Sequence, residues 1–318
     1  MMEAYDRYRD LPAKARGAAI AMGNFDGLHC GHRAVIDSAR TAAKTLHAPL
    51  GVAVFNPHPK QFFAPGAPAE HLQSDAARAR MLDALGVDLL YRLPFERSMS
   101  LMDDRAFVRD VLVDGLGIRH VSVGADFHYG RNRVGDAASL RAFGDEYGFG
   151  VAIVDLFGEN GEKYSSTAVR RALKAGDVHT AAHILGRPWS MEGLVLRGDQ
   201  RGRTIGVPTA NLALDDYVRP RFGVYAGHGR IDGKGPALPG VINIGKRPTV
   251  GGEEERLEIH LFDFAGDLYG RMLEVTLEHF LRDEKKFASL DALKEQIAKD
   301  MDQARALLQR TAKVDRAG

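Results

Sequence analysis

The sequence has almost no cysteine, since Cys30 is the only one among 318 residues. A single cysteine excludes an intramolecular disulfide, which is typical of a protein in the reducing cytoplasm. The sequence also lacks net charge: 43 Lys and Arg against 42 Asp and Glu leave +1, so no global field draws it to nucleic acid or to a membrane. It has no apolar run of about 18 residues, and the polar stretch 1–16 does not resemble a signal peptide. We therefore expect a cytoplasmic protein without nucleic-acid or membrane partners, and no obligate protein partner is evident.

The first half of the chain has the pattern of an α/β domain. A length of 318 residues favours two domains, and 45% hydrophobic with 27% charged residues is an ordinary globular composition. Short apolar runs alternate with segments of helical spacing, which predicts a parallel sheet covered on both faces. The predicted strands are 18–22, 51–55, 89–93, 120–123 and 151–155, and the predicted helices are 34–46, 75–85, 103–116 and 137–147. A further helix is predicted to start at Ser165 or Ser166 and to stop at Gly176.

Beyond Pro188 glycine and proline become frequent, and the strands lose their intervening helices. Consecutive strands with turn residues between them predict an antiparallel barrel or sandwich. The predicted strands are 193–197, 224–231, 241–244, 256–262 and 272–281, and a charged amphipathic helix over 290–308 follows them. We predict the domains to be 1–184 and 185–318.

The strongest local motif is Gly23-Asn24-Phe25-Asp26-Gly27-Leu28-His29-Cys30-Gly31-His32, directly after the first apolar run. It predicts a buried strand, a glycine turn and a helix whose first turn carries two histidines on one face. Glycines allow a positive φ or a close approach of ligand to backbone, and free N–H groups at a helix start attract anions. The motif therefore predicts a phosphate site, with candidate residues Gly23, Phe25, Asp26, His29, Gly31 and His32.

Two other interpretations of the histidine pair stay open at this point. His29 and His32 with Cys30 between them could form half of a zinc site. Zinc needs three or four protein ligands, and the chain has no second cysteine and no second paired cluster. The histidines could also be structural residues at a helix start.

Three further segments of the first domain carry polar or aromatic groups. Asn56-Pro57-His58-Pro59 follows a predicted strand and precedes Phe62-Phe63, so a stiff loop adjoins aromatics that could stack on a flat ring. Gly124-Ala125-Asp126-Phe127-His128-Tyr129-Gly130 follows another strand at the same sheet edge. Ser165-Ser166-Thr167 with Arg170 predicts a second anion site at a helix start, or simply a well-capped helix.

The second domain holds a basic, glycine-containing stretch over 197–211. Its backbone N–H groups could face an anion, and Gly202, Arg203 and Thr204 are candidates to bind phosphate, although the stretch is not a usual P-loop. Thr209 and Asn211 offer neutral oxygens suited to a hydrated Mg²⁺. Glu258 lies on an alternating strand and is either a general base or a charge on the wet face of a sheet.

These motifs together resemble the prokaryotic bifunctional riboflavin kinase/FAD synthetase family. The similarity extends from about residue 18 to 300 and keeps the family's motif order. It includes Gly-Arg-Thr-x-Gly-x-Pro-Thr-Ala-Asn and, downstream, Asn243-Ile244-Gly245-Lys246-Arg247-Pro248-Thr249, Asp267-Leu268-Tyr269-Gly270 and Leu281-Arg282-Asp283-Glu284-Lys285-Lys286-Phe287. The histidine motif alone marks only the wider nucleotidyltransferase superfamily, whereas its combination with the Pro-Thr-Ala-Asn loop is far more specific.

The resemblance implies a Rossmann-like nucleotidyltransferase domain, an antiparallel β-barrel kinase domain, and two activities. The C-terminal domain would phosphorylate riboflavin with ATP to FMN, and the N-terminal domain would transfer AMP from ATP to FMN, giving FAD and pyrophosphate. By matched position, His29 and His32 would bind the ATP phosphates. Asp126 would lie beside the substrates, and Ser166, Thr167 and Arg170 would stabilise the pyrophosphate. In the kinase, Thr209 and Asn211 would hold Mg²⁺ and ATP, and Glu258 would take the proton of the ribityl hydroxyl.

The candidate flavin-binding residues of the first domain are Pro57, Pro59, Phe62 and Tyr129. The sequence departs from the family pattern at Asn56, Tyr129, Tyr164 and Lys246, and the first two leave flavin affinity open. Two alternatives also remain. One is a chain in which only one domain is active, such as a nucleotidyltransferase with a ligand-sensing barrel. The other is a non-catalytic regulator that responds to flavin.

Overall fold

The computed structural model describes residues 1–155, 158–159, 162–197, 206–249 and 252–314. Its chain forms two compact units. The first consists of Met1–Pro68 with Asp75–Ser165, and the second consists of Ala69–Ser74 with Ser166–Gly318. Among the described residues, no helix has the length and apolar character needed to cross a bilayer.

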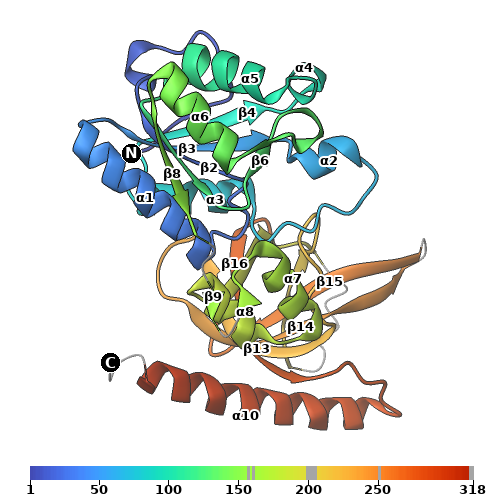
Figure 1. Ribbon diagram of the computed structural model, residues 1–318. Coiled ribbons are helices and arrows are strands. Elements are labelled where there is room, and N and C mark those ends of the chain that lie inside the picture. The colour runs from blue at the N-terminus through green and yellow to red at the C-terminus, as the bar shows by residue number, and fades with distance from the viewer. Residues whose placement is uncertain (156–157, 160–161, 198–205, 250–251, 315–318) are drawn as a thin grey trace. The chain divides into compact units, whose positions relative to one another are not determined.

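The first unit is built on a six-stranded parallel sheet with the order β1-β4-β3-β2-β5-β8 (Figure 1). The strands are β1 (Glu3–Tyr5), β2 (Ala19–Met22), β3 (Leu50–Asn56), β4 (Leu89–Pro94), β5 (His120–Gly124) and β8 (Gly150–Val154). The parallel sheet and its five predicted strands are confirmed. The sixth strand, β1, lies in the polar N-terminal stretch, where no apolar pattern marks it.

Helices cover both faces of this sheet, as predicted. The buried core on one face includes Leu112 and Leu140, and the core on the other face includes Ile36 and Leu82. The helical segments are α1 (Cys30–Leu46), α2 (Pro59–Phe63), α3 (Asp75–Ala84), α4 (Arg97–Ser100), α5 (Asp104–Phe107), the π-helix η2 (Val108–Leu116) and α6 (Ala137–Tyr147), with short 3₁₀ turns η1 (Ala13–Ala15) and η3 (Arg131–Arg133). Two small hairpins complete the unit, β6 (His128–Tyr129) with β7 (Gly135–Asp136) and β9 (Gly158–Glu159) with β10 (Glu162–Lys163).

The second unit is an antiparallel sheet with the order β11-β16-β13-β14-β15-β12. The strands are β11 (Trp189–Leu194), β12 (Ala210–Ala213), β13 (Gly223–Ile231), β14 (Leu238–Thr249), β15 (Gly252–Leu261) and β16 (Met272–Arg282). Just beyond β11, Leu196 donates its N–H to the Asn211 carbonyl of β12 at 2.8 Å, which links the two outer strands. This link gives the sheet the near-closed form of a barrel, in agreement with the predicted fold.

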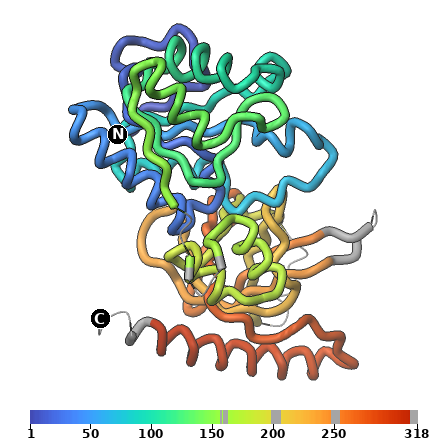
Figure 2. Tube along the Cα trace, viewed as in Figure 1, coloured from blue at the N-terminus to red at the C-terminus, as the bar shows by residue number. Residues whose placement is uncertain are grey.

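Helices α7 (Ser166–Ala175), α8 (Val178–Leu185) and α10 (Leu290–Val314) belong to the same unit, and Figure 2 traces α10 at the red end of the chain. Ala304 and Leu308 of α10 are buried with Ala226 and Phe262, so the helix covers the outer face of the sheet. The segment Ala69–Ser74 also packs here, because the indole N–H of Trp189 donates to the Leu72 carbonyl at 2.9 Å. The predicted boundary between residues 184 and 185 stays a prediction of where the two domains divide.

Candidate active sites

The turn between β2 and α1 has an unusual backbone. Phe25, Gly27 and Leu28 adopt φ angles of +49°, +87° and +44°. Positive φ is strained for a residue other than glycine, and such strain persists only where the surrounding packing enforces it. Phe25 and Leu28 are 1% and 0% exposed, so their burial holds the turn in this shape. The turn delivers the chain to the start of α1, where His29 is the N-cap residue.

The two histidines of the motif stack directly on each other. The ring centroids of His29 and His32 are 3.6 Å apart with an interplanar angle of 18°. The backbone N–H of His32 donates to Nδ1 of His29 at 3.2 Å, which leaves the proton of a neutral His29 ring on Nε2. A Cβ on Gly31 would lie 3.2 Å from two atoms of the His29 ring, so glycine makes room for this ring. The predicted pairing of the histidines is therefore confirmed in geometry.

His32 is held in its neutral form. Burial, and then the neighbouring His29 and Lys163, keep the pKa of His32 well below its usual range. Within the described part of the chain, the buried Nδ1 atom of His32 has no hydrogen-bond partner. Because buried polar atoms are nearly always paired, this unpaired ring nitrogen at a helix start makes the histidine pair a candidate ligand site.

Asp126, predicted to lie beside the substrates, follows β5 and forms an ion pair with Lys163 of β10. Its side chain is 60% exposed, so it is open to a ligand. Lys163 was not among the predicted site residues, although it stands two residues before the first serine of the Ser-Ser-Thr motif. Since Lys163 is close enough to affect the pKa of His32, the first unit brings a histidine pair, a lysine and a carboxylate together.

The proline loop of the first unit leads into a group of packed aromatic rings. The Asn56–Pro57 peptide bond is cis, and Pro59 begins the short helix α2. The rings of Phe62 and Phe95 are 5.3 Å apart between centroids, and the ring of Phe63, 68% exposed, packs on both. Phe62, Phe63 and Phe95 therefore form one aromatic cluster beside the proline loop. Phe95 was not predicted as part of it, because it lies more than 30 residues beyond the loop in sequence.

Tyr129, the other predicted aromatic, lies in the core of the first unit. It is 4% exposed, its ring stacks on Phe127, and its hydroxyl bonds the Ser139 hydroxyl at 3.1 Å. Burial raises the pKa of Tyr129 to about 12, so the hydroxyl stays protonated. The structure places this side chain as a support for the Phe127 ring.

Ser166, Thr167 and Arg170 lie in the first two turns of α7, which belongs to the second unit. Nε of Arg170 donates to the Glu70 carbonyl at 2.8 Å, so the segment Ala69–Ser74 holds this guanidinium. The predicted helix start at Ser165 or Ser166 is confirmed.

The second unit aligns three polar side chains across neighbouring strands. In the register of the sheet, Glu258 on β15 lies directly opposite Asn211 on β12 and Asn243 on β14. Directly opposite residues of antiparallel strands share one face, with Cβ atoms about 4.5–5.5 Å apart. The row Asn211–Glu258–Asn243 is therefore a built polar site, whereas the alternate residues Leu257 and Ile259 point into the core. Asn243 was not predicted, because only strand register brings it to Glu258.

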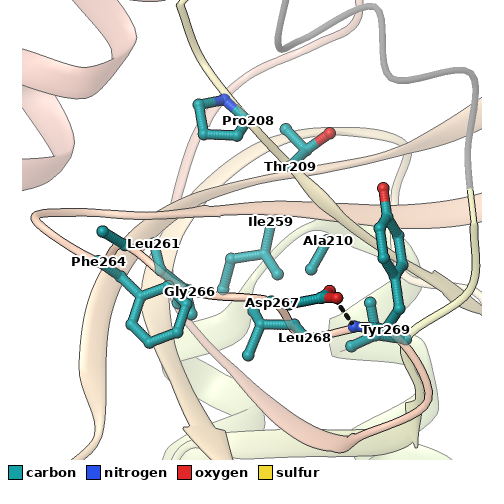
Figure 3. A pocket seen from close by; sticks show the side chains of 12 residues that line it. Pro208, Thr209, Ala210, Ile259, Leu261, Phe264, Gly266, Asp267, Leu268 and Tyr269 are labelled. Atoms are coloured by element: carbon teal, nitrogen blue, oxygen red, sulfur yellow. Dashed lines mark hydrogen bonds between the residues drawn. The ribbon is translucent and has the colours of Figure 1, made fainter.

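A pocket of about 390 Å³ lies between the Pro208–Ala210 segment and the loop that follows β15 (Figure 3). Apolar side chains form most of its wall, including Ile259, Leu261 and Phe264. The guanidinium of Arg197 lies 5.3 Å from the ring centroid of Tyr269, which flanks the same pocket. Such a wall suits a flat ring with polar edges. The loop lies in the Asp267-Leu268-Tyr269-Gly270 motif, to which no role was assigned from the sequence.

The oxygen atoms near this pocket fit a hard cation better than zinc. Thr209 borders the pocket, and Asn211, two residues later, faces Glu258. Hydroxyl, amide and carboxylate oxygens with added water or phosphate suit Mg²⁺. In the described ranges, no three His, Cys, Asp or Glu side chains form a group that could hold a metal by themselves. Gly202, Arg203 and Thr204 lie outside the described residues.

Known families match both parts of the chain. Residues 11–168 match the model of the FAD synthetase family, and residues 185–308 match the model of the riboflavin kinase family. A bifunctional riboflavin kinase/FMN adenylyltransferase from Escherichia coli K12 is 42% identical over 91% of this chain and 92% of its own. The protein of the same name from Pseudomonas fluorescens is 43% identical over 94% and 95%, and that of Bacillus subtilis 168 is 34% identical over 90% and 91%.

A solved structure shares the fold over nearly the whole chain. It is described as a macrolide-efflux protein from Streptococcus pneumoniae, and it covers 96% of this chain and 98% of its own at a TM-score of 0.86 and 32% identity.

Proposed function

This chain belongs to the family of bifunctional riboflavin kinase/FMN adenylyltransferases, and on that premise we propose how its two units divide the chemistry. It is an enzyme of flavin cofactor biosynthesis with two activities. One phosphorylates riboflavin with ATP to FMN. The other transfers AMP from ATP to FMN and releases pyrophosphate.

In the kinase reaction, Glu258 is the general base. The terminal ribityl hydroxyl attacks the γ-phosphorus of ATP, the bond from that phosphorus to the β,γ-bridging oxygen breaks, and ADP leaves. The hydroxyl must lose its proton, which a carboxylate within hydrogen-bond reach accepts. The proposal is supported by the row Asn211–Glu258–Asn243, which fixes Glu258 on a rigid strand. We place the adenine ring in the pocket beside Tyr269, with the phosphates directed toward Thr209.

Thr209 and Asn211 are the residues that would hold Mg²⁺ in the kinase. The cation would neutralise charge on the transferring phosphoryl group. Gly202, Arg203 and Thr204 are proposed to contact the ATP phosphates through their backbone and basic groups.

In the adenylyl transfer, the phosphate of FMN attacks the α-phosphorus of ATP, so no protein nucleophile is needed. The residues instead align the reactants and stabilise charge that develops on phosphate oxygens. We propose that ring N–H groups of His29 and of the neutral His32 donate hydrogen bonds to these oxygens, with Gly23, Phe25, Asp26 and Gly31 shaping the turn. Lys163 adds a positive charge beside them, and its ion pair with Asp126 keeps it in place.

The remaining candidates are assigned by their chemistry. Ser166, Thr167 and Arg170 are proposed to stabilise the departing pyrophosphate. Pro57, Pro59 and Phe62 are proposed to contact the flavin ring directly. Tyr129 is proposed to support flavin binding indirectly, because its ring stacks on that of Phe127. We also propose that the enzyme works in the cytoplasm, consistent with its single cysteine.

The observation that carries this division is that His29 with His32 and Glu258 with Asn211 belong to two separate compact units. The test is chromatography of the products after incubation with ATP and Mg²⁺, starting from riboflavin in one tube and from FMN in another. We expect riboflavin to pass through FMN to FAD in the first tube, and FMN to become FAD in the second. FMN that accumulates without FAD in either tube would contradict the adenylyl-transfer activity. FAD formed only from supplied FMN would contradict the kinase activity.

A further inference from the structure

The segment after β16 is clamped from two sides within the second unit. The guanidinium of Arg282 forms a bidentate pair with Asp300 of α10, with Nη2 to Oδ2 at 2.7 Å and Nε to Oδ1 at 3.0 Å. The next residue, Asp283, accepts two hydrogen bonds from Arg221 at 2.7 and 2.8 Å. Bidentate pairs of this kind fix direction as well as distance. The two pairs therefore fix the backbone directly before Glu284, and with it the position of that residue.

The carboxylate of Glu284 packs against β14 at Gly245, where the strand has no side chain. A Cβ built on Gly245 would lie 2.5 Å from Cδ of Glu284, so a side chain at this position would displace the carboxylate. From this position Glu284 forms a side-chain hydrogen bond with Asn243, two residues before Gly245 on the same strand. Gly245 thus provides the room, and Asn243 provides the partner.

The hydrogen bond sets the orientation of the Asn243 amide. Partial burial raises the pKa of Glu284, while Asn243 and Arg282 both favour its ionised form. An ionised carboxylate only accepts hydrogen bonds, so the NH₂ group of Asn243 faces Glu284 and its carbonyl oxygen faces the other way. Without Glu284, nothing in this contact would distinguish the two ends of the amide.

Asn243 is also the residue directly opposite Glu258 in the register of β14 and β15. We propose, building on the kinase activity assigned above, that Glu284 is a positioning residue for the kinase reaction. It holds the Asn243 amide so that the carbonyl oxygen lies beside Glu258 and accepts a hydrogen bond from a hydroxyl of the substrate's polyol chain. Glu258 and Asn243 then contact two hydroxyls of one chain, which aligns the reacting oxygen with its base.

The test measures kcat and KM for riboflavin at saturating ATP and Mg²⁺ in the full-length chain. We expect Glu284→Ala to lower kcat about 10²-fold, because a misplaced reactant loses rate on this scale. Glu284→Gln keeps an oxygen that accepts the same bond, so its kcat should stay within about threefold of the wild type. The double variant Asn243→Ala/Glu284→Ala should be no slower than Asn243→Ala alone, because Glu284 acts through Asn243.

Gly245→Ala is the second variant, since it displaces the carboxylate and leaves Glu284 itself unchanged. It should lower kcat in the same way as Glu284→Ala. Thermal unfolding of each variant is the control for folding of the second unit, and FAD formation from supplied FMN shows that the other activity is retained.

A wild-type kcat in both Glu284→Ala and Gly245→Ala would overturn the proposal. So would losses that multiply in the double variant, or a Glu284→Gln enzyme as slow as Glu284→Ala, because each points to a merely structural role. Absence of FMN formation in the wild-type chain would instead contradict the kinase activity itself, so the two failures are distinguishable.

Discussion

In the first unit the turn that carries the histidine pair is built from residues close together along the chain, whereas in the second unit the polar row comes from distant strands. Phe25, His29 and His32 span eight positions between the end of β2 and the first turn of α1. Asn211, Asn243 and Glu258 lie on three strands and meet only through register. The first site depends on a strained turn whose shape is fixed by buried side chains. The second depends on strand pairing, and a slip of one residue would turn Glu258 toward the core.

This difference predicts different sensitivities. Damage to the histidine turn should stay local, because few distant residues build it. Damage to the strands or to the segment after β16 should reach the kinase site from far away. Variants that remove one activity and spare the other test this comparison directly.

The largest effect is expected at the kinase site. Glu258→Gln keeps the size of the side chain and removes the base, so FMN formation should fall by about 10²–10⁴. FAD formation from supplied FMN should be unchanged, and both rates are read from the same chromatographic assay. Retained kinase turnover would remove Glu258 from the role of base. A parallel loss of FAD synthesis would contradict the independence of the two units.

The next effect is expected at the histidine pair. His29→Ala or His32→Ala removes one preorganised donor and should lower FAD formation by about 10²–10³, while FMN formation stays near the wild-type rate. Because the two rings stack, the double variant should cost less than the product of the single losses. Equal losses of FAD and FMN formation would show that folding of both units depends on this turn.

Most of the fold follows from the periodicity of the sequence. Five strands of the parallel sheet are short apolar runs, and helix α6 was predicted at its observed bounds from its helical spacing. The structure adds a capping box of Asp136 and Ser139 at the start of this helix. The short strands β1 and β12 were missed. Each has only three or four residues, and β12 owes its conformation to pairing with β15 rather than to a local pattern.

The same distinction between local patterns and long-range pairing decides which residues of the candidate sites were predicted. The histidine turn was predicted because its residues are adjacent in sequence. Asn243 and Lys163 were not, since the first needs the register of β14 with β15 and the second needs the position of the β9–β10 hairpin near His32. The contribution of Ala69–Ser74 to the second unit was also beyond prediction, because it rests on long-range contacts such as Trp189 to Leu72.

Smaller effects are expected on stability, where matched variants separate the two units. In the first unit the buried hydroxyl of Tyr91 donates to the Ala15 carbonyl at 2.9 Å, and in the second the Trp189 indole donates to Leu72. Tyr91→Phe and Trp189→Phe each leave a carbonyl without its donor, which costs about 1–2 kcal/mol. Trp189→Phe also leaves a cavity in the core, so its total cost should be larger.

Calorimetry should show the two variants lowering different unfolding transitions. Trp189 is the only tryptophan, so its fluorescence in the Tyr91→Phe variant reports on the second unit alone. That fluorescence transition should stay at the wild-type temperature. A shift of both transitions in either variant would show that the units unfold together.

The smallest effect is expected from a drop in pH, which should lower the free energy of unfolding of the first unit through His32. The pKa of His32 is lowered by burial and by His29 and Lys163, so in the folded chain the ring stays neutral where an unfolded histidine takes up a proton. The unfolded state therefore binds more protons below about pH 6.5, and stability falls as the pH drops through that value. At about pH 5.5 the loss from one such histidine is about 1 kcal/mol.

His32→Gln should flatten this dependence, because it removes the group that resists protonation. Burial also lowers the pKa of His120 in the same unit, so His120→Gln is the matched comparison and should remove a smaller part of the slope. The measurement is the midpoint of the first unit's calorimetric transition between about pH 7.5 and 5.5, a range above the titration of most carboxylates. An unchanged slope in His32→Gln would mean that the folded turn accepts the proton. In that case the stacked pair would carry a charge, and it would bind phosphate as a cation rather than as a pair of neutral donors.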